Sequence, residues 1–390
     1  MPPIAIHAER ALTPFEDIPD AVVVVEGSKI SAVGRRGEVE LPRGTREVAA
    51  KGKTIVPGFV DVHIHGAGGH DVMEATPEAL RVVAAAVARH GTTSMVATTV
   101  TAAASDLSRR IAGIARFILE ARKLPEREGA AEILGIHLEG PFISQARRGV
   151  HPAEWIAAAS PGMLSQFLDQ ARGTAQIITL APELPGALEL IGMARAAGLV
   201  VSLGHTDATY EQAQAAIAAG ARQAAHIFNA MRPFSHRETG VIGAVLTSPE
   251  VSVELIADGI HVDAAAMRIV LDLKTPRRVI LVSDATAATG MPDGKYRLGS
   301  FEITVSGGVC RNAEGRLAGS TLTLDRALRN VITLGVPLEA ALPMVTANPA
   351  RQIGLGDRKG VLAAGADADL VALDANLEVA GVMTGGAGKI

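Results

Sequence analysis

His63 and His65 stand two positions apart in an apolar segment, and this spacing places both imidazoles on the same face of a β-strand. Other apolar segments also end in side chains that can bind a metal or move a proton: His137-Leu-Glu139, His205-Thr206-Asp207, His226-Ile-Phe-Asn229, Asp258-Gly-Ile-His261 and Ser283-Asp284. Neutral imidazoles and carboxylates are ligands of divalent transition metals. The pattern therefore predicts a metal centre of one or two ions per chain. We expect zinc, with iron, cobalt or manganese as alternatives.

Each of these side chains also has a simpler interpretation. An isolated His-X-His pair is a weak signal, and a single strand-end histidine such as His205 is more often structural. Asp284 could cap the next helix, and Glu139 could be a turn residue before Gly-Pro. The simpler interpretations do not explain why six of eight predicted strands end in a ligand-type side chain. We therefore interpret the chain as a metal-dependent hydrolase.

Apolar runs alternate with Ala-rich amphipathic segments from Pro57 onward, as expected of a parallel sheet covered by helices. Helical segments between the runs include Thr76–His90, Ser105–Lys123 and Thr209–Ala219. Eight such runs predict a closed (β/α)8 barrel, in which reactive groups lie at the carboxyl ends of the strands. The predicted strands are Gly58–Ile64, Thr93–Thr98, Ile133–Leu138, Gln176–Ala181, Leu199–Leu203, Gln223–Ile227, Val253–Ala257 and Val279–Val282.

The two ends of the chain have strand-like rather than helical patterns. Near the N-terminus, AVVVVEGSKISAVG predicts two short strands around a turn at Glu26-Gly27. The tail returns to strand chemistry after Gly360, so we expect a small β-sandwich domain formed by residues 1–56 and 358–390. Residues 57–357 would form the barrel, with a hairpin in the Gly-rich segment Thr289–Gly319.

The composition argues against several other classes of protein. The net charge of −4 and the lack of a Lys/Arg block exclude a nucleic-acid-tracking surface. No apolar run reaches the roughly 18 residues of a membrane span, and the N-terminal segment is not a signal peptide. The single cysteine, Cys310, excludes an internal disulfide framework, so we expect a cytoplasmic protein.

Several longer motifs make the interpretation more specific. PGFVDVHIHG and AGADADLV are general, whereas HLEGPF, GHTDATYEQ and HIFNAM together are distinctive. The chain resembles the N-acetylglucosamine-6-phosphate deacetylase family of the amidohydrolase superfamily from Pro57 to its tail. Many two-metal members of the superfamily bridge their ions with a carboxylated lysine on the fourth strand. That strand has no lysine here, and Glu139 is the natural substitute.

The resemblance also implies roles for individual residues. Glu139, His205 and His226 would hold the principal metal, and His63 and His65 would make a second site that shares Glu139. Asp284 would be the acid/base residue, and His151 would stabilise the oxyanion. The sugar phosphate would contact the remaining site residues: Val150, His151, Asn229, Ala230, Arg237, His261, Leu317, Ala318 and Gly319. A second subunit would complete the phosphate pocket, so we expect a homodimer.

The reaction implied is hydrolysis of the N-acetyl group of N-acetyl-D-glucosamine 6-phosphate by metal-activated water. Three alternatives stay open at this point. The substrate could be N-acetylgalactosamine 6-phosphate, which differs at one hydroxyl. The enzyme could be a cyclic-amide hydrolase, which the missing fourth-strand lysine disfavours. A metal-binding barrel without catalysis is also conceivable, but Asp284 argues against it.

Overall fold

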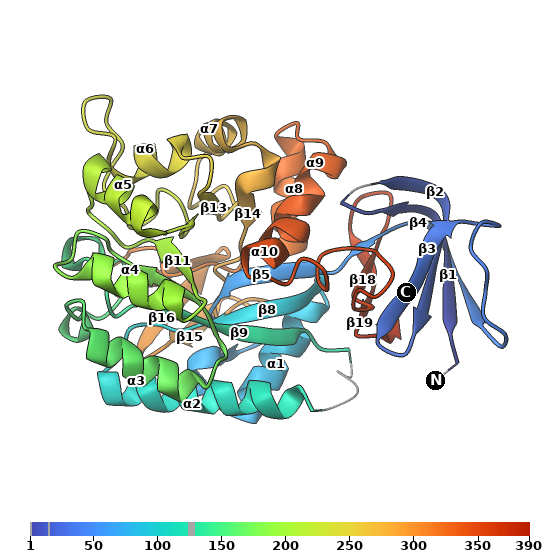
Figure 1. Ribbon diagram of the computed structural model, residues 1–390, viewed down its shortest axis with the longest axis horizontal. Coiled ribbons are helices and arrows are strands. Elements are labelled where there is room, and N and C mark those ends of the chain that lie inside the picture. Colours follow the sequence, from blue (N-terminus) through green and yellow to red (C-terminus); the bar gives the residue numbers. More distant parts are fainter. Residues whose placement is uncertain (1, 15, 124–128) are drawn as a thin grey trace.

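The computed structural model describes residues 2–14, 16–123 and 129–390, and its larger unit is a barrel (Figure 1). Eight parallel strands follow one another round the sheet in chain order. Backbone hydrogen bonds from His65 and Gly66 to Ala285, and from Asp284 to His63, join the last strand to the first. The strands are β5 (Phe59–Ile64), β8 (Thr92–Thr98), β9 (Glu132–Glu139), β10 (Ala175–Leu180), β11 (Val200–Leu203), β12 (Gln223–Ala224), β13 (Ser252–Leu255) and β14 (Val279–Leu281).

A helix follows each barrel strand, directly or after an intervening segment, so the predicted (β/α)8 fold is confirmed. The helices are α1 (Pro77–Ala88), α2 (Ala104–Ala121), α3 (Pro161–Ala171), α4 (Ala187–Ala196), α5 (Tyr210–Ala219), α6 (Gly240–Thr247), α7 (Ala264–Lys274), α8 (Leu324–Thr333), α9 (Leu338–Val345) and α10 (Ala347–Gln352). In the described ranges, no helix is long and apolar enough to cross a membrane.

Local sequence fixes where these helices begin and end. The Thr209 side chain accepts a hydrogen bond from the backbone of Gln212, whose own side chain accepts one from the backbone of Thr209. This capping box starts α5, and Gly220, with a φ of +116°, ends it. Helix α1 begins with a simpler cap, in which the Thr76 side chain accepts a hydrogen bond from the backbone N–H of Ala79, and it has Pro77 in its first turn.

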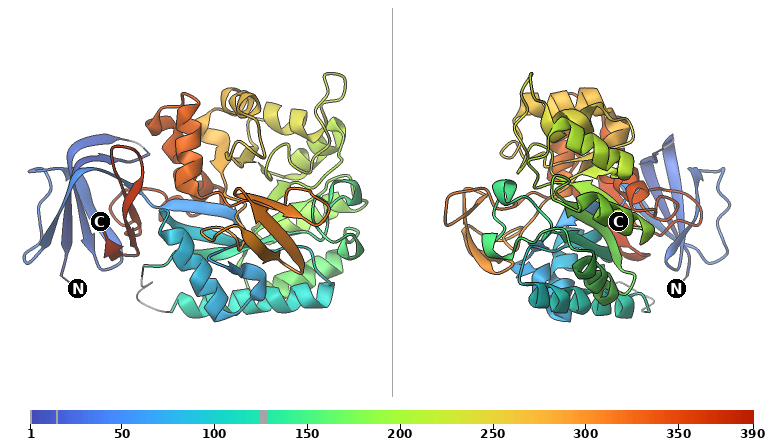
Figure 2. Two further views of the ribbon diagram at one scale, coloured as in Figure 1. Left: turned by 180° about the vertical axis from the view of Figure 1, so that it is seen from behind. Right: turned by 60° about the vertical axis from the view of Figure 1, so that its left-hand side comes forward.

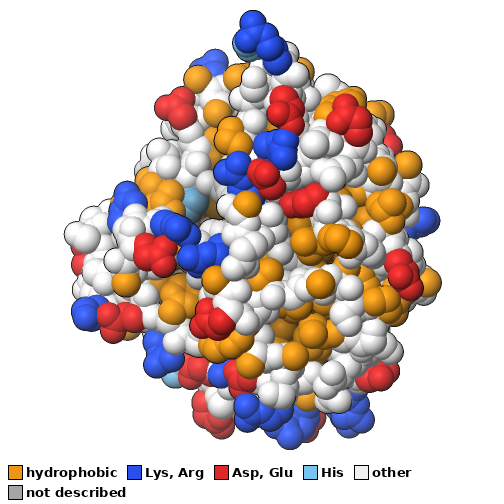
Figure 3. Space-filling view, turned by 90° about the vertical axis from the view of Figure 1, so that its left-hand side faces the viewer, with side chains coloured by type: hydrophobic (Ala, Val, Ile, Leu, Met, Phe, Trp, Pro, Cys, Tyr) orange, Lys and Arg blue, Asp and Glu red, His pale blue; other side chains and the backbone are white. Residues whose placement is uncertain are grey.

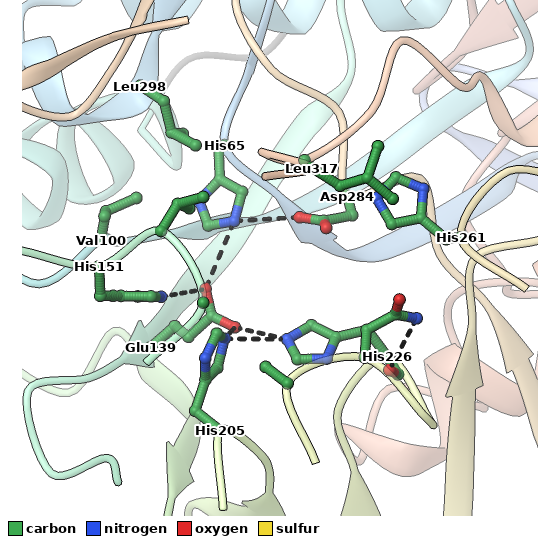
Figure 4. A pocket seen from close by; sticks show the side chains of 15 residues that line it. His65, Val100, Glu139, His151, His205, His226, His261, Asp284, Leu298 and Leu317 are labelled. Carbon is green, nitrogen blue, oxygen red and sulfur yellow. Dashed lines mark hydrogen bonds and ion pairs between the residues drawn. The ribbon is translucent and has the colours of Figure 1, made fainter. Parts of the chain in front are cut away.

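Strand β12 is shorter than predicted. The apolar run suggested Gln223–Ile227, but regular strand ends at Ala224 because His226 adopts a φ of +26°. A left-handed backbone conformation cannot continue a strand. The consequence is functional, since the turn directs the His226 side chain toward the middle of the barrel end (Figure 4).

The smaller unit combines both ends of the chain, as predicted. Hydrogen bonds join its seven strands into one sheet in the order β20-β19-β18-β4-β1-β2-β3. One apolar core draws residues from strands far apart in that order, including Ile6, Val23, Ile55, Leu370 and Met383. The strands are β1 (Ile4–Leu12), β2 (Asp17–Glu26), β3 (Lys29–Arg35), β4 (Arg46–Pro57), β18 (Leu370–Leu373), β19 (Val379–Thr384) and β20 (Ala387–Lys389).

The predicted hairpin after the eighth strand is a three-stranded antiparallel sheet. Its strands are β15 (Gly294–Leu298), β16 (Phe301–Ser306) and β17 (Val309–Asn312). The right-hand view of Figure 2 shows this orange sheet on one side of the barrel and the small domain on the other. Leu298, Ile303, Cys310 and Ala318 pack with Val100 of the barrel into a small separate core. The sheet is therefore fixed beside the carboxyl ends of the barrel strands.

Candidate active site and metal centre

Many of the predicted strand-end residues meet in one pocket, a cavity of about 170 Å³ at the carboxyl ends of the barrel strands (Figure 4). It is lined by polar residues from separate strands and by apolar residues of the hairpin sheet and the loops. The lining residues are His65, Val100, Glu139, Gly149, Val150, His151, His205, His226, Asn229, Ala230, His261, Asp284, Leu298, Leu317 and Gly319.

Glu139 lies at the centre of this arrangement, and its side chain is buried. Its Oε1 is 3.0 Å from Nε2 of His226, 3.2 Å from Nε2 of His205 and 3.3 Å from Nε2 of His63. Its Oε2 is 3.4 Å from Nε2 of His65. Tetrahedral zinc with bonds near 2.0–2.1 Å holds its ligand atoms roughly 3.3 Å apart. The spacing of these atoms therefore fits a shared divalent ion.

The hydrogen bonds of three histidines fix which ring nitrogen carries the proton. Nδ1 of His63 is 2.7 Å from a carboxylate oxygen of Glu254, and Nδ1 of His65 is 3.0 Å from the carbonyl of Thr98. Nδ1 of His205 is 3.1 Å from a backbone carbonyl. These oxygens accept hydrogen bonds, so each Nδ1 is the donor. The Nε2 atom of each ring faces Glu139 and is the atom that could bind a metal.

The charges of the site also call for a cation. Glu139, Glu254 and Asp284 are buried carboxylates, and among the described residues no Lys or Arg lies within ion-pair distance of them. Burial would lower the pKa of His63, but the charges of Glu139 and Glu254 outweigh burial and raise that pKa well above its usual value. A field that attracts protons this strongly also attracts a metal ion. The centre is built for a divalent metal.

Two further histidines are set apart from this group by their surroundings. Burial and the neighbouring His63 lower the pKa of His137 to about 3, and both of its ring nitrogens have hydrogen-bond partners within the barrel. His137 is thus a structural residue beneath the site. Burial and His151 lower the pKa of His205 to about 4, so His205 is a neutral ring suited to bind a metal.

The backbone holds four pocket residues in a left-handed conformation that residues other than glycine rarely adopt. The φ angles are +47° at His205, +26° at His226, +50° at Ala230 and +48° at Asp284. Such conformations cost about 1–3 kcal/mol each and cluster at functional sites. Gly319 packs so closely that a Cβ there would lie 2.8 Å from the carbonyl oxygen of Asp284. The return segment of the hairpin sheet therefore braces Asp284.

Asp284 and His151 face the pocket from opposite sides of Glu139 (Figure 4). Oδ1 of Asp284 is 3.2 Å from Nε2 of His65. Burial would raise the pKa of Asp284, but the hydrogen bond with His65 and the charge of His63 lower it to about 2. Nδ1 of His151 accepts a hydrogen bond from the backbone N–H of Thr101, at 3.2 Å. Neutral His151 therefore carries its proton on Nε2, 3.7 Å from Glu139.

Three predicted site residues do not line the pocket. His63 lies beneath it, fully buried against Glu139 and Glu254. Ala318 is buried in the small core of the hairpin sheet, which also contains Leu298 of the pocket lining. Arg237 is exposed on the loop between β12 and α6. The neighbouring Glu238 forms an ion pair with Arg232 rather than with Arg237.

Comparison with known proteins agrees with this geometry. The profile of the amidohydrolase family matches residues 54–388. A curated N-acetylglucosamine-6-phosphate deacetylase of Vibrio furnissii is 38% identical over 96% of this chain and 92% of its own. A solved structure of such an enzyme from Mycobacterium smegmatis, a mutant in complex with N-acetyl-D-glucosamine-6-phosphate, has a TM-score of 0.92 and 39% identity. It covers 100% of this chain and 99% of that one.

The chain belongs to the N-acetylglucosamine-6-phosphate deacetylase family of amidohydrolases. An N-acetylgalactosamine-6-phosphate deacetylase of Escherichia coli O157:H7 is 40% identical over 83% of this chain and 85% of its own. The similarity thus extends to deacetylases named for either amino sugar.

Sequence reasoning missed the residues that hold the predicted ones in place in this deacetylase family member. Glu254 supports His63, and Thr101 supports His151. Asp258, which the sequence did mark as a strand-end carboxylate, accepts a hydrogen bond from Nδ1 of His261 at 2.7 Å. A charged residue within the apolar run Val253–Ala257 was a usable signal for Glu254, because a buried carboxylate requires partners. The backbone of Thr101 carries no such signal.

Proposed function

We propose that this protein hydrolyses the N-acetyl group of N-acetyl-D-glucosamine 6-phosphate and releases D-glucosamine 6-phosphate and acetate. The observation that carries the proposal is the convergence of His65, His205, His226 and Asp284 on the buried carboxylate of Glu139. Relatives named for this reaction match nearly the full length of the chain. We also propose a cytoplasmic location, on the single cysteine of the sequence.

Glu139, His205 and His226 would hold the principal metal ion, and His63 and His65 a second one that shares Glu139. When bound, such an ion lowers the pKa of a water molecule toward about 7 and polarises a carbonyl oxygen. Imidazole and carboxylate ligands suit zinc best, and they also accept iron, cobalt or manganese.

Asp284 would transfer the proton in this reaction. Its low pKa keeps it ionised at neutral pH, so it is ready to accept a proton from the attacking water. The same carboxyl group would then donate that proton to the departing amine. His151 would stabilise the negative charge on the acetyl oxygen, because its Nε2–H faces the cavity while its Nδ1 is occupied by Thr101.

The sugar would lie against the apolar and amide groups of the same cavity, from Val150, Asn229, Ala230, His261, Leu317 and Gly319. A 6-phosphate needs fixed positive charge, yet none of the described lining residues is a lysine or an arginine. Arg237 is exposed on the surface of its own chain. We propose that Arg237 of a second copy completes the phosphate pocket in a homodimer.

N-acetylgalactosamine 6-phosphate is the second candidate substrate, because of the Escherichia coli relative. The experiment is to measure kcat/KM on both amino-sugar phosphates and on N-acetylglucosamine without phosphate. We expect the gluco epimer to be preferred. Loss of the phosphate should reduce kcat/KM about ten- to a hundred-fold, because a charge-assisted contact is worth roughly 1.5–3 kcal/mol.

Arg237→Ala should reproduce part of that reduction, and only with phosphorylated substrates. Arg36→Ala is the matched control, since Arg36 is an exposed arginine of the small domain that pairs with Asp20. Equal rates on N-acetylglucosamine and its 6-phosphate would refute the phosphate pocket. A higher kcat/KM on the galacto epimer would make N-acetylgalactosamine 6-phosphate the substrate instead.

A further inference from the structure

Glu254 of strand β13 lies beneath the active site and is fully buried. One of its oxygens, Oε2, is 2.7 Å from Nδ1 of His63 and 3.2 Å from the backbone nitrogen of His226. The other oxygen accepts a hydrogen bond from the side chain of Gln223. A single carboxylate thus contacts one proposed ligand through its ring and another through its backbone.

Glu254 and His63 lie close enough to His137 to suggest a further metal site, but their hydrogen bonds rule it out. Nδ1 of His63 donates to Glu254, so it has no lone pair to offer a metal. His137 uses one ring nitrogen on the carbonyl of Val62 and the other on the hydroxyl of Thr179. These contacts support the ligands above them instead.

We propose that Glu254 is a positioning residue shared by the two metal sites, fixing the tautomer of His63 and the backbone of His226. It does not lie in the lining of the substrate cavity, so it acts through the two histidines. The proposal rests on the two-ion arrangement of the proposed function.

The partner of His63 differs in kind from those of the other ligands. His65 and His205 donate their Nδ1–H to neutral backbone carbonyls, whereas His63 donates to a charged carboxylate. A carboxylate partner makes the opposite ring nitrogen more basic and strengthens its bond to a metal, and losing such a partner typically weakens metal binding ten- to a hundred-fold.

The contact with His226 extends the role of Glu254 to the principal site. Among the described residues, Nδ1 of His226 has no hydrogen-bond partner, so the side chain of His226 is not fixed from behind. The left-handed backbone at His226, with a φ of +26°, has its N–H bound to Glu254. Removing this acceptor should loosen the segment that directs His226 toward Glu139.

Two substitutions separate the charge of Glu254 from its hydrogen bonds. Glu254→Gln keeps an acceptor for His63 and His226. The amide of Gln223 can turn to meet the new NH2 group, because its Oε1 has no partner among the described residues. Glu254→Leu keeps the volume but leaves both donors without an acceptor. His63→Ala is the reference, because it removes one ligand and leaves the His226 backbone contact in place.

The measurement is titration of metal-free protein with Co²⁺, followed by absorption spectroscopy, with zinc counted separately in dialysed protein. His63→Ala should lose only the second ion. Glu254→Gln should bind that second ion about ten- to a hundred-fold more weakly. Glu254→Leu should weaken both ions, which His63→Ala does not do. Asp325→Leu is the control for general destabilisation, because Asp325 is a buried carboxylate that pairs with Arg329 and has no interaction with a proposed ligand.

Two results would overturn the proposal. One is wild-type affinity for both ions in Glu254→Leu, and the other is a Glu254→Leu protein that matches His63→Ala. These readouts need no substrate, so they do not depend on which amide the enzyme cleaves. A wild-type protein that binds one ion would reject the two-ion arrangement itself, and this shows in the reference titration before any variant is compared.

Discussion

Two groups of buried charges in this molecule obtain their positive charge in different ways. At the junction of the barrel and the small domain, Nζ of the fully buried Lys359 lies 2.7 Å from Glu132, 2.8 Å from Asp367 and 2.6 Å from Asp369. Lys29 and Arg358 pair with the same Asp367. We call these six residues the junction cluster.

The active site gathers comparable carboxylates without such a cation. Glu139, Glu254 and Asp284 are buried as well, but among the described residues the only ionisable groups of positive charge within ion-pair distance of them are histidines. A buried carboxylate without a partner is strongly unfavourable. At the junction, lysine and arginine side chains of the chain itself supply the positive charge. At the active site, a metal ion from solution would supply it. The difference teaches that the region where the chain supplies no cation is where the chemistry takes place.

Metal removal should have the largest effect and should fall on the active site alone. We expect a strong chelator to abolish deacetylase activity, because Glu139 and the histidines around it then lack their cation. Added Zn²⁺ should restore the activity. The far-UV circular dichroism should remain that of a folded barrel, since the junction cluster carries its own lysine. Metal analysis alongside the activity assay makes the measurement, and full activity in metal-free protein would contradict the comparison.

Asp284→Asn should have the next largest effect. Asn is nearly isosteric but cannot accept a proton, so kcat should fall by roughly 10²–10⁴ while KM changes much less. The metal content should stay near that of the wild type. If metal is lost in step with activity, Asp284 is chiefly a ligand, and a near-normal kcat would remove it from the mechanism.

The sequence predicted the residues of the active site better than the residues that hold them in place. His63, His65, Glu139, His205 and His226 could be found because each lies at the end of an apolar run, and the barrel brings such ends together. The left-handed turn that shortens β12 depends on packing around it, so the apolar run beyond Ala224 gave no sign of it.

The junction cluster was beyond sequence reasoning for a different reason. Lys359 stands in GDRKGV, a segment that looks like an ordinary exposed loop. Its burial arises only when the C-terminal strands pack beside the N-terminal ones, across more than 200 residues from Glu132. Contacts between such distant segments leave no local pattern, whereas strand-end histidines repeat with every βα unit.

Lys359→Met tests the other half of the comparison. Removing one partner of a buried ion pair leaves uncompensated charge and costs about 3–5 kcal/mol. We expect the free energy of unfolding in urea to fall by that amount, with metal content and kcat unchanged. Lys29→Met is the matched control, because Lys29 is half exposed and an exposed pair contributes about 0–1 kcal/mol. Loss of metal from Lys359→Met would show that the two clusters are coupled.

The pH dependence of stability in the same variant should show the smallest effect, and it tests whether Lys359 stabilises an ionised Asp367. Burial would raise the pKa of Asp367, but Lys359, Arg358 and Lys29 outweigh burial and hold that pKa far below its usual value of about 3.9. A depressed carboxyl pKa adds stability that is present above the unfolded pKa and is lost as pH falls through the folded one. The wild-type advantage over Lys359→Met should therefore be constant from about pH 5 to 7 and shrink below about pH 4. An advantage that grows toward acid would mean that Lys359 does not stabilise an ionised Asp367.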